Sequence, residues 1–218
     1  MSIRLNPIII NKNVSKTFEQ TIRNNLAKLP ENIKSSVKNH NKKYLLTQVM
    51  TDAAPWLKGK TPSGWPDGMT WNNCESACNK RKAVFCEKAF AESGAPIKGA
   101  VYHETAHLVD KIFKDVAGRQ FCETNGFKTA YKKDVAHIFE KYSTNNELKL
   151  PSEYLHYFLQ GSRPDKVTIR GLQETFAETF TILNNATNGK LYNDFILQNY
   201  KNTIKYMDKF MYLFGGKK

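Results

Sequence analysis

The sequence predicts an α+β domain in which a small sheet in the first half is followed by a helical second half. Three observations support this prediction: strand-forming residues gather at 44–50 and 82–90, apolar residues recur at helical spacing in both halves, and a His-Glu-x-x-His pattern occupies 103–107. The chain has 218 residues, 40% of them hydrophobic, which is enough to bury one core. Because no internal repeat is visible, residues 1–218 are expected to form a single domain, with 1–14 as a flexible N-terminal segment.

The first half is predicted to contain a helix, a strand, a loop and a second strand. Residues 15–29 form an amphipathic helix that Pro30 ends, since their apolar side chains recur every three or four positions: Phe18, Ile22, Leu26 and Leu29. The strand at 44–50 leads to a loop at 55–71 that is too rich in Pro and Gly for regular structure. We expect this loop to be ordered by its tryptophans, Trp56, Trp65 and Trp71. The second strand, at 82–90, precedes a turn that contains Gly and Pro.

The second half is predicted to be helical. The helix of the His-Glu-x-x-His motif is followed by an apolar helical pattern at 127–142. A short aromatic helix at 153–160 and a helix at 171–183 come next. The apolar residues of 194–214 then recur over several turns, so we expect one long terminal helix that covers the core.

The motif His103-Glu104-x-x-His107 predicts a zinc site with a general base beside it. On a helix, residues four apart differ by about 40° around the axis and by about 6 Å along it, so both imidazoles face one cation. Glu104 lies on the adjacent face, where its carboxylate can take a proton from water next to the metal. The alternative is two solvated histidines on a surface helix. We predict one Zn²⁺ per chain.

A catalytic zinc ion usually has a third protein ligand. The extended metzincin pattern is excluded, because it requires Gly at 110 and His at 113, where this chain has Asp110 and Phe113. Asp110 is better suited to accept a hydrogen bond from a ligand or to form an ion pair. Glu174 is the stronger candidate, since it shares a helical face with Glu178, and Glu178 can then orient a ligand histidine. Glutamates at this spacing are otherwise usually a solvated surface pair.

Two segments, HETAHLVD at 103–110 and ETFAETF at 174–180, resemble the catalytic domain of anthrax lethal factor and its relatives, which include small secreted Pro-Pro endopeptidases. Residues 57–68 also resemble a segment that precedes the catalytic residues of those proteins. The resemblance implies a compact, gluzincin-like zincin fold with a small sheet that lines the cleft. It also implies site residues, with zinc bound by His103, His107 and Glu174 and with Glu104 as the base.

Two features depart from the family pattern. Glu174 lies 67 positions after the second histidine, which is long for the family and indicates an insertion around 143–166. Val167 occupies the position, seven residues before the glutamate, where relatives tend to carry a tyrosine that can donate to the developing oxyanion. Either Tyr157 or His156 supplies this donor, with Tyr157 our first choice, or electrophilic assistance is weaker.

The substrate is predicted to bind along a strand. In zinc peptidases a strand shortly before the metal helix commonly lies along the cleft, where its free edge can pair with an extended peptide. The residues that we expect to form this edge are Val84, Phe85, Cys86 and Glu87. Together with the motifs, this predicts a monomeric zinc-dependent endopeptidase that acts on a protein or peptide.

Composition bears on partners and location. The net charge is +13, yet only six of the 33 basic residues are arginine, which favours a lysine-rich surface with a bias toward acidic segments of a substrate over a nucleic-acid interface. No stretch is long enough for a membrane span or the apolar part of a signal peptide. By the resemblance, the protein would be secreted or delivered into a target cell, as a toxin or a surface-remodelling protease.

Several alternatives stay open. A non-catalytic docking domain could share the fold, although such a domain would lack the zinc residues, and a basic nucleic-acid-binding protein with a structural metal would explain the charge but not the two glutamates. The four cysteines are Cys74, Cys78, Cys86 and Cys122, and they predict either four reduced thiols or one or two disulfides.

Overall fold

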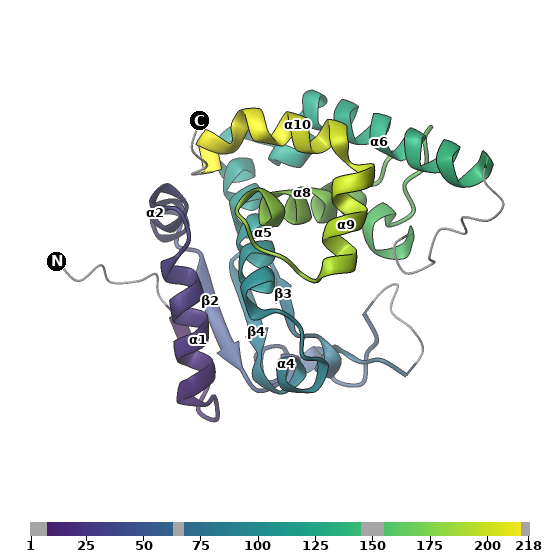
Figure 1. Cartoon of the computed structure of the whole chain (residues 1–218). Helices are drawn as coiled ribbons and strands as arrows, with labels where there is room; N and C mark the ends of the chain where they lie inside the picture. The colour runs from purple at the N-terminus through teal and green to yellow at the C-terminus, as the bar shows by residue number, and fades with distance from the viewer. Residues whose placement is uncertain (1–7, 63–67, 145–154, 215–218) are drawn as a thin grey trace.

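The computed structural model describes residues 8–62, 68–144 and 155–214 and shows an α+β architecture (Figure 1). Its sheet has the strand order β1-β2-β4-β3. The first three strands in this order run parallel, and β3 runs antiparallel to β4. The strands are β1 (Ile8–Ile10), β2 (Lys43–Thr47), β3 (Ser76–Cys78) and β4 (Lys82–Cys86). The predicted α+β class is therefore confirmed.

The helices of the first half are α1 (Lys16–Ala27), α2 (Glu31–Asn39), α3 (Met50–Ala53), α4 (Glu87–Ser93) and the long central helix α5 (Ile97–Ala117). In Figure 1, α1 and α2 lie on one side of α5, and helices of the second half lie on the other side. Those of the second half are α6 (Asn125–Thr144), α8 (Ile169–Leu183), α9 (Lys190–Asn199) and α10 (Lys201–Phe210). Short 3-10 helices lie at Pro55–Leu57, Trp71–Asn73, Phe121–Glu123 and Met211–Phe214, and a π-helical turn lies at Leu155–Leu159. The helical second half agrees with the sequence prediction.

Within the segment 1–14 that was predicted to be flexible, residues 8–10 form the strand β1, so the prediction is wrong for these three residues. Ile8, Ile9 and Ile10 pair in parallel with residues 44–46 of β2. Ser15 then caps α1, where its Oγ accepts a hydrogen bond of 3.1 Å from the Phe18 amide. Three β-branched residues in a row favour a strand, but their partner lies more than thirty residues away, which is why the sequence alone did not reveal the pairing.

The two predicted strands are real but shorter than expected. β2 ends at Thr47 and β4 at Cys86, and in both cases the chain turns into a short helix, α3 or α4. The side chains of each strand alternate between two cores. Tyr44 and Phe85 face the main core, whereas Leu45 and Val84 face a smaller cluster on the other side of the sheet.

The loop predicted at 55–71 falls partly outside the described residues, and Trp65 lies in that gap. Trp71 is partly buried against the smaller cluster, as expected of a residue that orders a loop. Trp56 is 68% exposed and cannot anchor the loop. The predicted insertion at 143–166 and the predicted short helix at 153–160 also lie partly outside the residues that the structure describes.

The single terminal helix predicted at 194–214 is instead two helices with a break at Tyr200. The cause lies on α6. Both oxygens of the Asp134 carboxylate bind the first turn of α10, where the amides of Asn202 and Thr203 donate at 3.0 and 2.8 Å. A carboxylate at this position satisfies amides that a continuous helix would pair internally, so the chain starts a new helix there.

Candidate metal centre and active site

His103 and His107 project from one face of α5 toward α8. Their Nε2 atoms lie 3.1 Å apart, and their rings meet edge to face. The first turn of α5 is also held close to the segment after α8. At Gly99 a Cβ atom would collide with the carbonyl oxygen of Thr187, so only glycine allows this approach. The two helices thus bring residues far apart in sequence to one place.

Glu174 completes a group of three residues with metal-ligand chemistry. Its Oε2 lies 3.4 Å from His103 Nε2, and its Oε1 lies 3.7 Å from His107 Nε2. One ligand atom from each residue lies within 4.8 Å of the others. A tetrahedral zinc ion with bonds of about 2.0–2.1 Å separates its ligand atoms by about 3.3 Å. The donor types and the separations therefore fit zinc.

Glu178 orients His103 from behind. It is fully buried, and its Oε1 lies 3.1 Å from His103 Nδ1. The same oxygen accepts hydrogen bonds from Tyr157 OH at 2.9 Å and from Asn188 Nδ2 at 2.8 Å. A carboxylate at Nδ1 fixes the ring so that Nε2 faces the metal position. Asn188 was missed by the sequence analysis, because a single asparagine in a loop carries no pattern.

The candidate base Glu104 is 4% exposed and lies next to the outer strand of the sheet. Its Oε1 accepts a hydrogen bond of 2.9 Å from Ser76 Oγ of β3, and no described residue is hydrogen-bonded to its buried Oε2. A buried carboxylate oxygen without a partner is costly unless a ligand or water satisfies it. The second oxygen is therefore available to a bound molecule. Ser76 was not singled out from the sequence.

Asp110 accepts no hydrogen bond from either histidine. Its carboxylate instead binds the segment after α5, with Gln120 Nε2 at 2.9 Å and the Cys122 amide at 3.1 Å. Gln120 accepts in turn from Gln173 Nε2 of α8 at 2.9 Å. Asp110 thus links α5 to α8 through Gln120. The link reaches α8 at Gln173, one residue before the candidate ligand Glu174.

The predicted substrate-binding edge is wrong. Val84, Phe85 and Cys86 belong to β4, which has β2 on one side and β3 on the other, and Glu87 begins α4. The free edge beside α5 belongs to β3, the strand of Ser76. The order of strands depends on which segments meet in space, and a three-residue strand such as β3 gives little sequence signal.

Tyr157 lies beside the candidate centre, on the π-helical turn. Its hydroxyl donates to Glu178, and burial together with the carboxylates of Glu178 and Glu174 raises the pKa of this phenol well above its usual value. Tyr157 is thus a neutral donor to the carboxylate that contacts His103. The side chain of His156, the second candidate for oxyanion stabilisation, lies outside the described residues.

A positive charge at His103 is favoured, because this histidine lies between the carboxylates of Glu174 and Glu178. Burial by itself lowers the pKa of His103, but the carboxylates of Glu174 and Glu178 outweigh burial and raise this pKa well above its usual value. Burial by itself raises the pKa of Glu174, but His107 and His103 outweigh it and hold that pKa well below the usual value. Either a proton or a metal cation can meet this demand.

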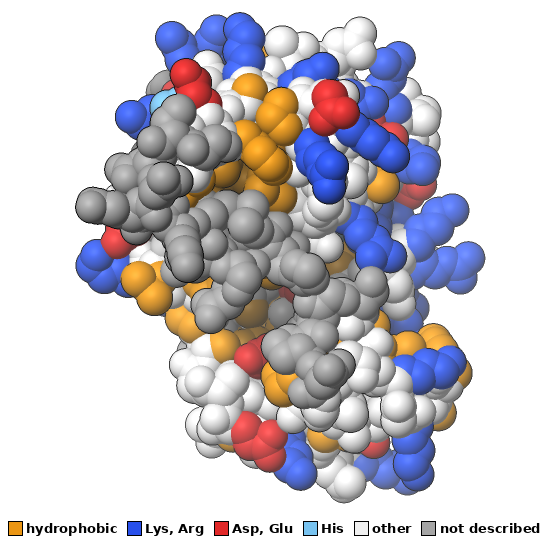
Figure 2. Space-filling model, turned by 90° about the vertical axis from the view of Figure 1, so that its right-hand side faces the viewer, with side chains coloured by type: hydrophobic (Ala, Val, Ile, Leu, Met, Phe, Trp, Pro, Cys, Tyr) orange, Lys and Arg blue, Asp and Glu red, His pale blue; other side chains and the backbone are white. Residues whose placement is uncertain are grey.

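The cysteines and the surface bear on the other predictions. All four cysteines are free thiols, which agrees with the reduced alternative. Figure 2 shows Lys and Arg side chains along the upper and right-hand margins of one face, with fewer acidic side chains. Among the described residues, no helix is long and apolar enough to cross a membrane.

Comparison with known proteins connects these observations. No curated protein matches the sequence. Among solved structures, the chain is similar to the Pro-Pro endopeptidase PPEP-2 from Paenibacillus alvei, with a TM-score of 0.58 and 19% identity over 93% of this chain and 96% of that chain. This similarity shows a shared fold. The family model described as anthrax toxin lethal factor, N- and C-terminal domain, matches residues 3–210. The chain therefore belongs to the anthrax toxin lethal factor family.

Proposed function

We propose that the protein is a zinc-dependent endopeptidase with a zincin-type centre. The observation that carries the proposal is the meeting of His103, His107 and Glu174, with Glu104 buried beside them. The family includes N- and C-terminal domains of lethal factor, so membership alone does not decide between catalysis and docking. A docking domain that had lost activity would have no reason to keep three ligands and a base together.

The chemistry follows from the roles of these side chains. His103, His107 and Glu174 would hold the zinc ion, which when bound would supply the Lewis acidity to polarise a carbonyl oxygen and acidify water. Glu104 accepts a proton from the attacking water and passes it to the leaving amine. Ser76 holds one oxygen of Glu104, which leaves the other to make this transfer. Glu178 keeps His103 turned toward the metal position, and Tyr157 is a neutral donor to Glu178.

The substrate is proposed to bind along β3. β3 and β4 are antiparallel, and backbone hydrogen bonds join Glu75 to Cys86 and Asn79 to Lys82. Because the hydrogen-bonded residues alternate along such a pair, the backbone groups of Ala77 also face β4. The backbone groups of Ser76 and Cys78 then point to the free edge, where an extended peptide can add as a strand. Such a peptide would pass directly beside Glu104. The substrate class is therefore an extended protein segment, cleaved outside the producing cell or inside a target cell.

The decisive experiment combines metal analysis with cleavage mapping. The purified chain is expected to contain about one zinc per molecule and to cleave members of a peptide library that includes Pro-Pro sequences. Glu104→Ala is expected to retain zinc and the native melting temperature while cleavage is lost. Equal cleavage by this variant and the wild type would overturn the proposal. A wild-type chain that binds zinc but cleaves nothing would favour the docking function.

A further inference from the structure

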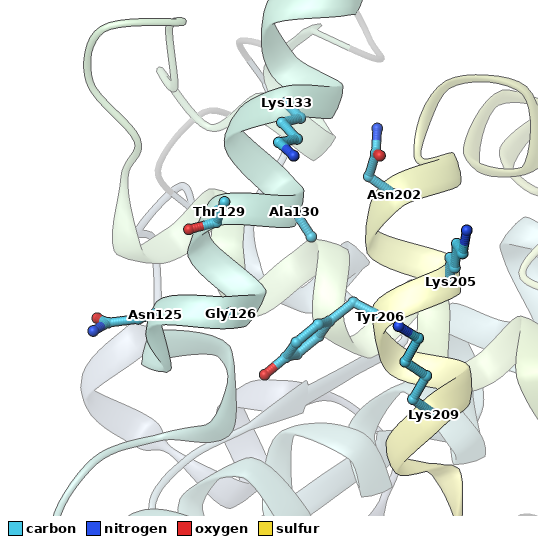
Figure 3. Close-up of a pocket in the computed structure, with 9 residues that line it drawn as sticks. All are labelled: Asn125, Gly126, Thr129, Ala130, Lys133, Asn202, Lys205, Tyr206 and Lys209. Atoms are coloured by element: carbon cyan, nitrogen blue, oxygen red, sulfur yellow. The ribbon is translucent and has the colours of Figure 1, made fainter.

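A shallow, open pocket lies between α6 and α10, and none of the candidate metal ligands lines it. It has a volume of about 380 Å³ and is lined by nine residues (Figure 3). Three of them are lysines, Lys133 from α6 and Lys205 and Lys209 from α10, and none is acidic. The pocket therefore gathers positive charge with no acidic residue in its lining, and this charge attracts anions.

The three ammonium groups have no counter-ion within the described part of the chain. No carboxylate there lies within ion-pair distance of Lys133, Lys205 or Lys209, whereas other surface lysines, such as Lys190, do have acidic partners. The acidic residue buried between the same two helices is Asp134. It is 1% exposed, and its oxygens accept four hydrogen bonds from the first turn of α10. The charge of Asp134 is therefore committed to α10.

The floor of the pocket is built for close contact between the helices. In Figure 3, Tyr206 extends from α10 toward the first turn of α6. A Cβ atom at Gly126 would lie 2.5 Å from the Tyr206 ring, so glycine makes room for that ring. Asn125 and Gly126 also form the start of the 20-residue helix α6, whose N-terminal end carries a partial positive charge. The helix end and the lysines thus act with the same sign.

We propose that this pocket docks an acidic segment of a protein partner. Its size suits a few side chains of a peptide, and the Tyr206 ring contributes an aromatic surface to the same lining as the three lysines. The lining has no arginine, the residue that most often reads phosphate and nucleic-acid bases. An aromatic layer separates the pocket from the ligand helix α8, since Tyr206 contacts Phe127 at 6.4 Å and Phe127 contacts Phe176 at 6.0 Å. The proposed docking pocket is thus separated in space from the candidate metal centre.

The test measures binding of a defined probe and does not depend on zinc or cleavage. A fluorescein-labelled, acetylated hexaglutamate peptide is titrated with the metal-free full-length chain, and a hexaglutamine peptide serves as the uncharged probe. We expect the acidic probe alone to bind, and we expect Lys133→Gln/Lys205→Gln/Lys209→Gln to raise its Kd by about tenfold or more. The corresponding triple Lys→Arg variant keeps the charge and is expected to bind within about threefold of wild type.

A matched control separates the pocket from net charge. Lys12, Lys38 and Lys114 are exposed on other parts of the chain, and changing all three to Gln removes the same charge. This control is expected to bind the acidic probe nearly as wild type does. Equal weakening in both triple variants would overturn the proposal, as would failure of wild type to bind the probe. Tighter binding of a single-stranded oligonucleotide, lost in the pocket variant, would reassign the pocket to nucleic acid.

Discussion

Tyr157 donates a hydrogen bond of 2.9 Å to Glu178, the carboxylate that also lies 3.1 Å from His103 Nδ1. The tyrosine thus contacts the group that orients a candidate ligand. This arrangement gives Tyr157 two distinct roles to test, because the same phenol can hold Glu178 in place or can turn to donate to a developing oxyanion.

Tyr157→Phe separates these roles, since it keeps the ring and removes the donor. We expect the positioning role to dominate, so zinc affinity falls by about 10-fold while kcat at saturating zinc changes little. Zinc titration and kinetics at saturating metal measure the two effects separately. A fall of about 100- to 1000-fold in kcat at saturating zinc would instead assign the oxyanion role to Tyr157.

Glu174→Ala is expected to remove most of the bound zinc, because two histidines alone leave the site one ligand short. Asp110→Asn is the control. It keeps the size of the side chain and the contact with Gln120 but removes the charge. Metal content after dialysis should be near one zinc per chain in the control and far lower in Glu174→Ala. The reverse order would show that the ligand assignment is wrong.

The metal-free protein is expected to be most stable between about pH 4.5 and 6.5. The depressed pKa of Glu174 stabilises the fold above its ordinary value of 4.5, and this contribution is lost as pH falls through the folded pKa. The raised pKa of His103 stabilises the fold below 6.5, and this contribution is lost as pH rises through the folded pKa. Melting temperatures measured in a chelator across pH 3 to 9 should depend less on pH in Glu174→Gln than in the wild type. Zinc should stabilise more as pH rises above 6.5, because it competes with protons for the histidines.

Asp134→Ala is expected to destabilise the fold by about 2 kcal/mol, since it leaves the first turn of α10 without its acceptor. For a chain of this size that corresponds to a fall in Tm of about 4 to 8 °C. Asp208→Ala provides the control, because Asp208 is exposed on the same helix. Calorimetry should show almost no change in the control. Equal losses in both variants would mean that the interaction of Asp134 with α10 is not what stabilises this helix.

Local patterns in the sequence predicted much of the candidate site. His103 and His107 are four residues apart on one helix, and Glu174 and Glu178 are four apart on another, so helical periodicity placed each pair on one face. Such periodicity depends only on the residues of the helix itself, which a sequence displays directly.

The features that sequence analysis missed depend on contacts between distant segments. Ser76 reaches Glu104 from a three-residue strand, and Asn188 reaches Glu178 from a loop. Asp134 starts α10 from another helix, which is why the terminal helix was predicted as continuous. The substrate edge was assigned to Val84 and its neighbours for the same reason, since both edges of β4 are taken by strands that only the folded chain brings together.

The division of the candidate ligands between α5 and α8 has a consequence for motion. A metal ion that joins His103 and Glu174 would close the intervening chain into a loop, as a covalent cross-link does, and would lower the entropy of any state in which the two helices separate. Amides of α8 should then exchange with deuterium more slowly when zinc is bound, while those of α1, which contributes no ligand, keep their exchange rate. The metal would therefore set how often the two helices that carry the candidate ligands separate.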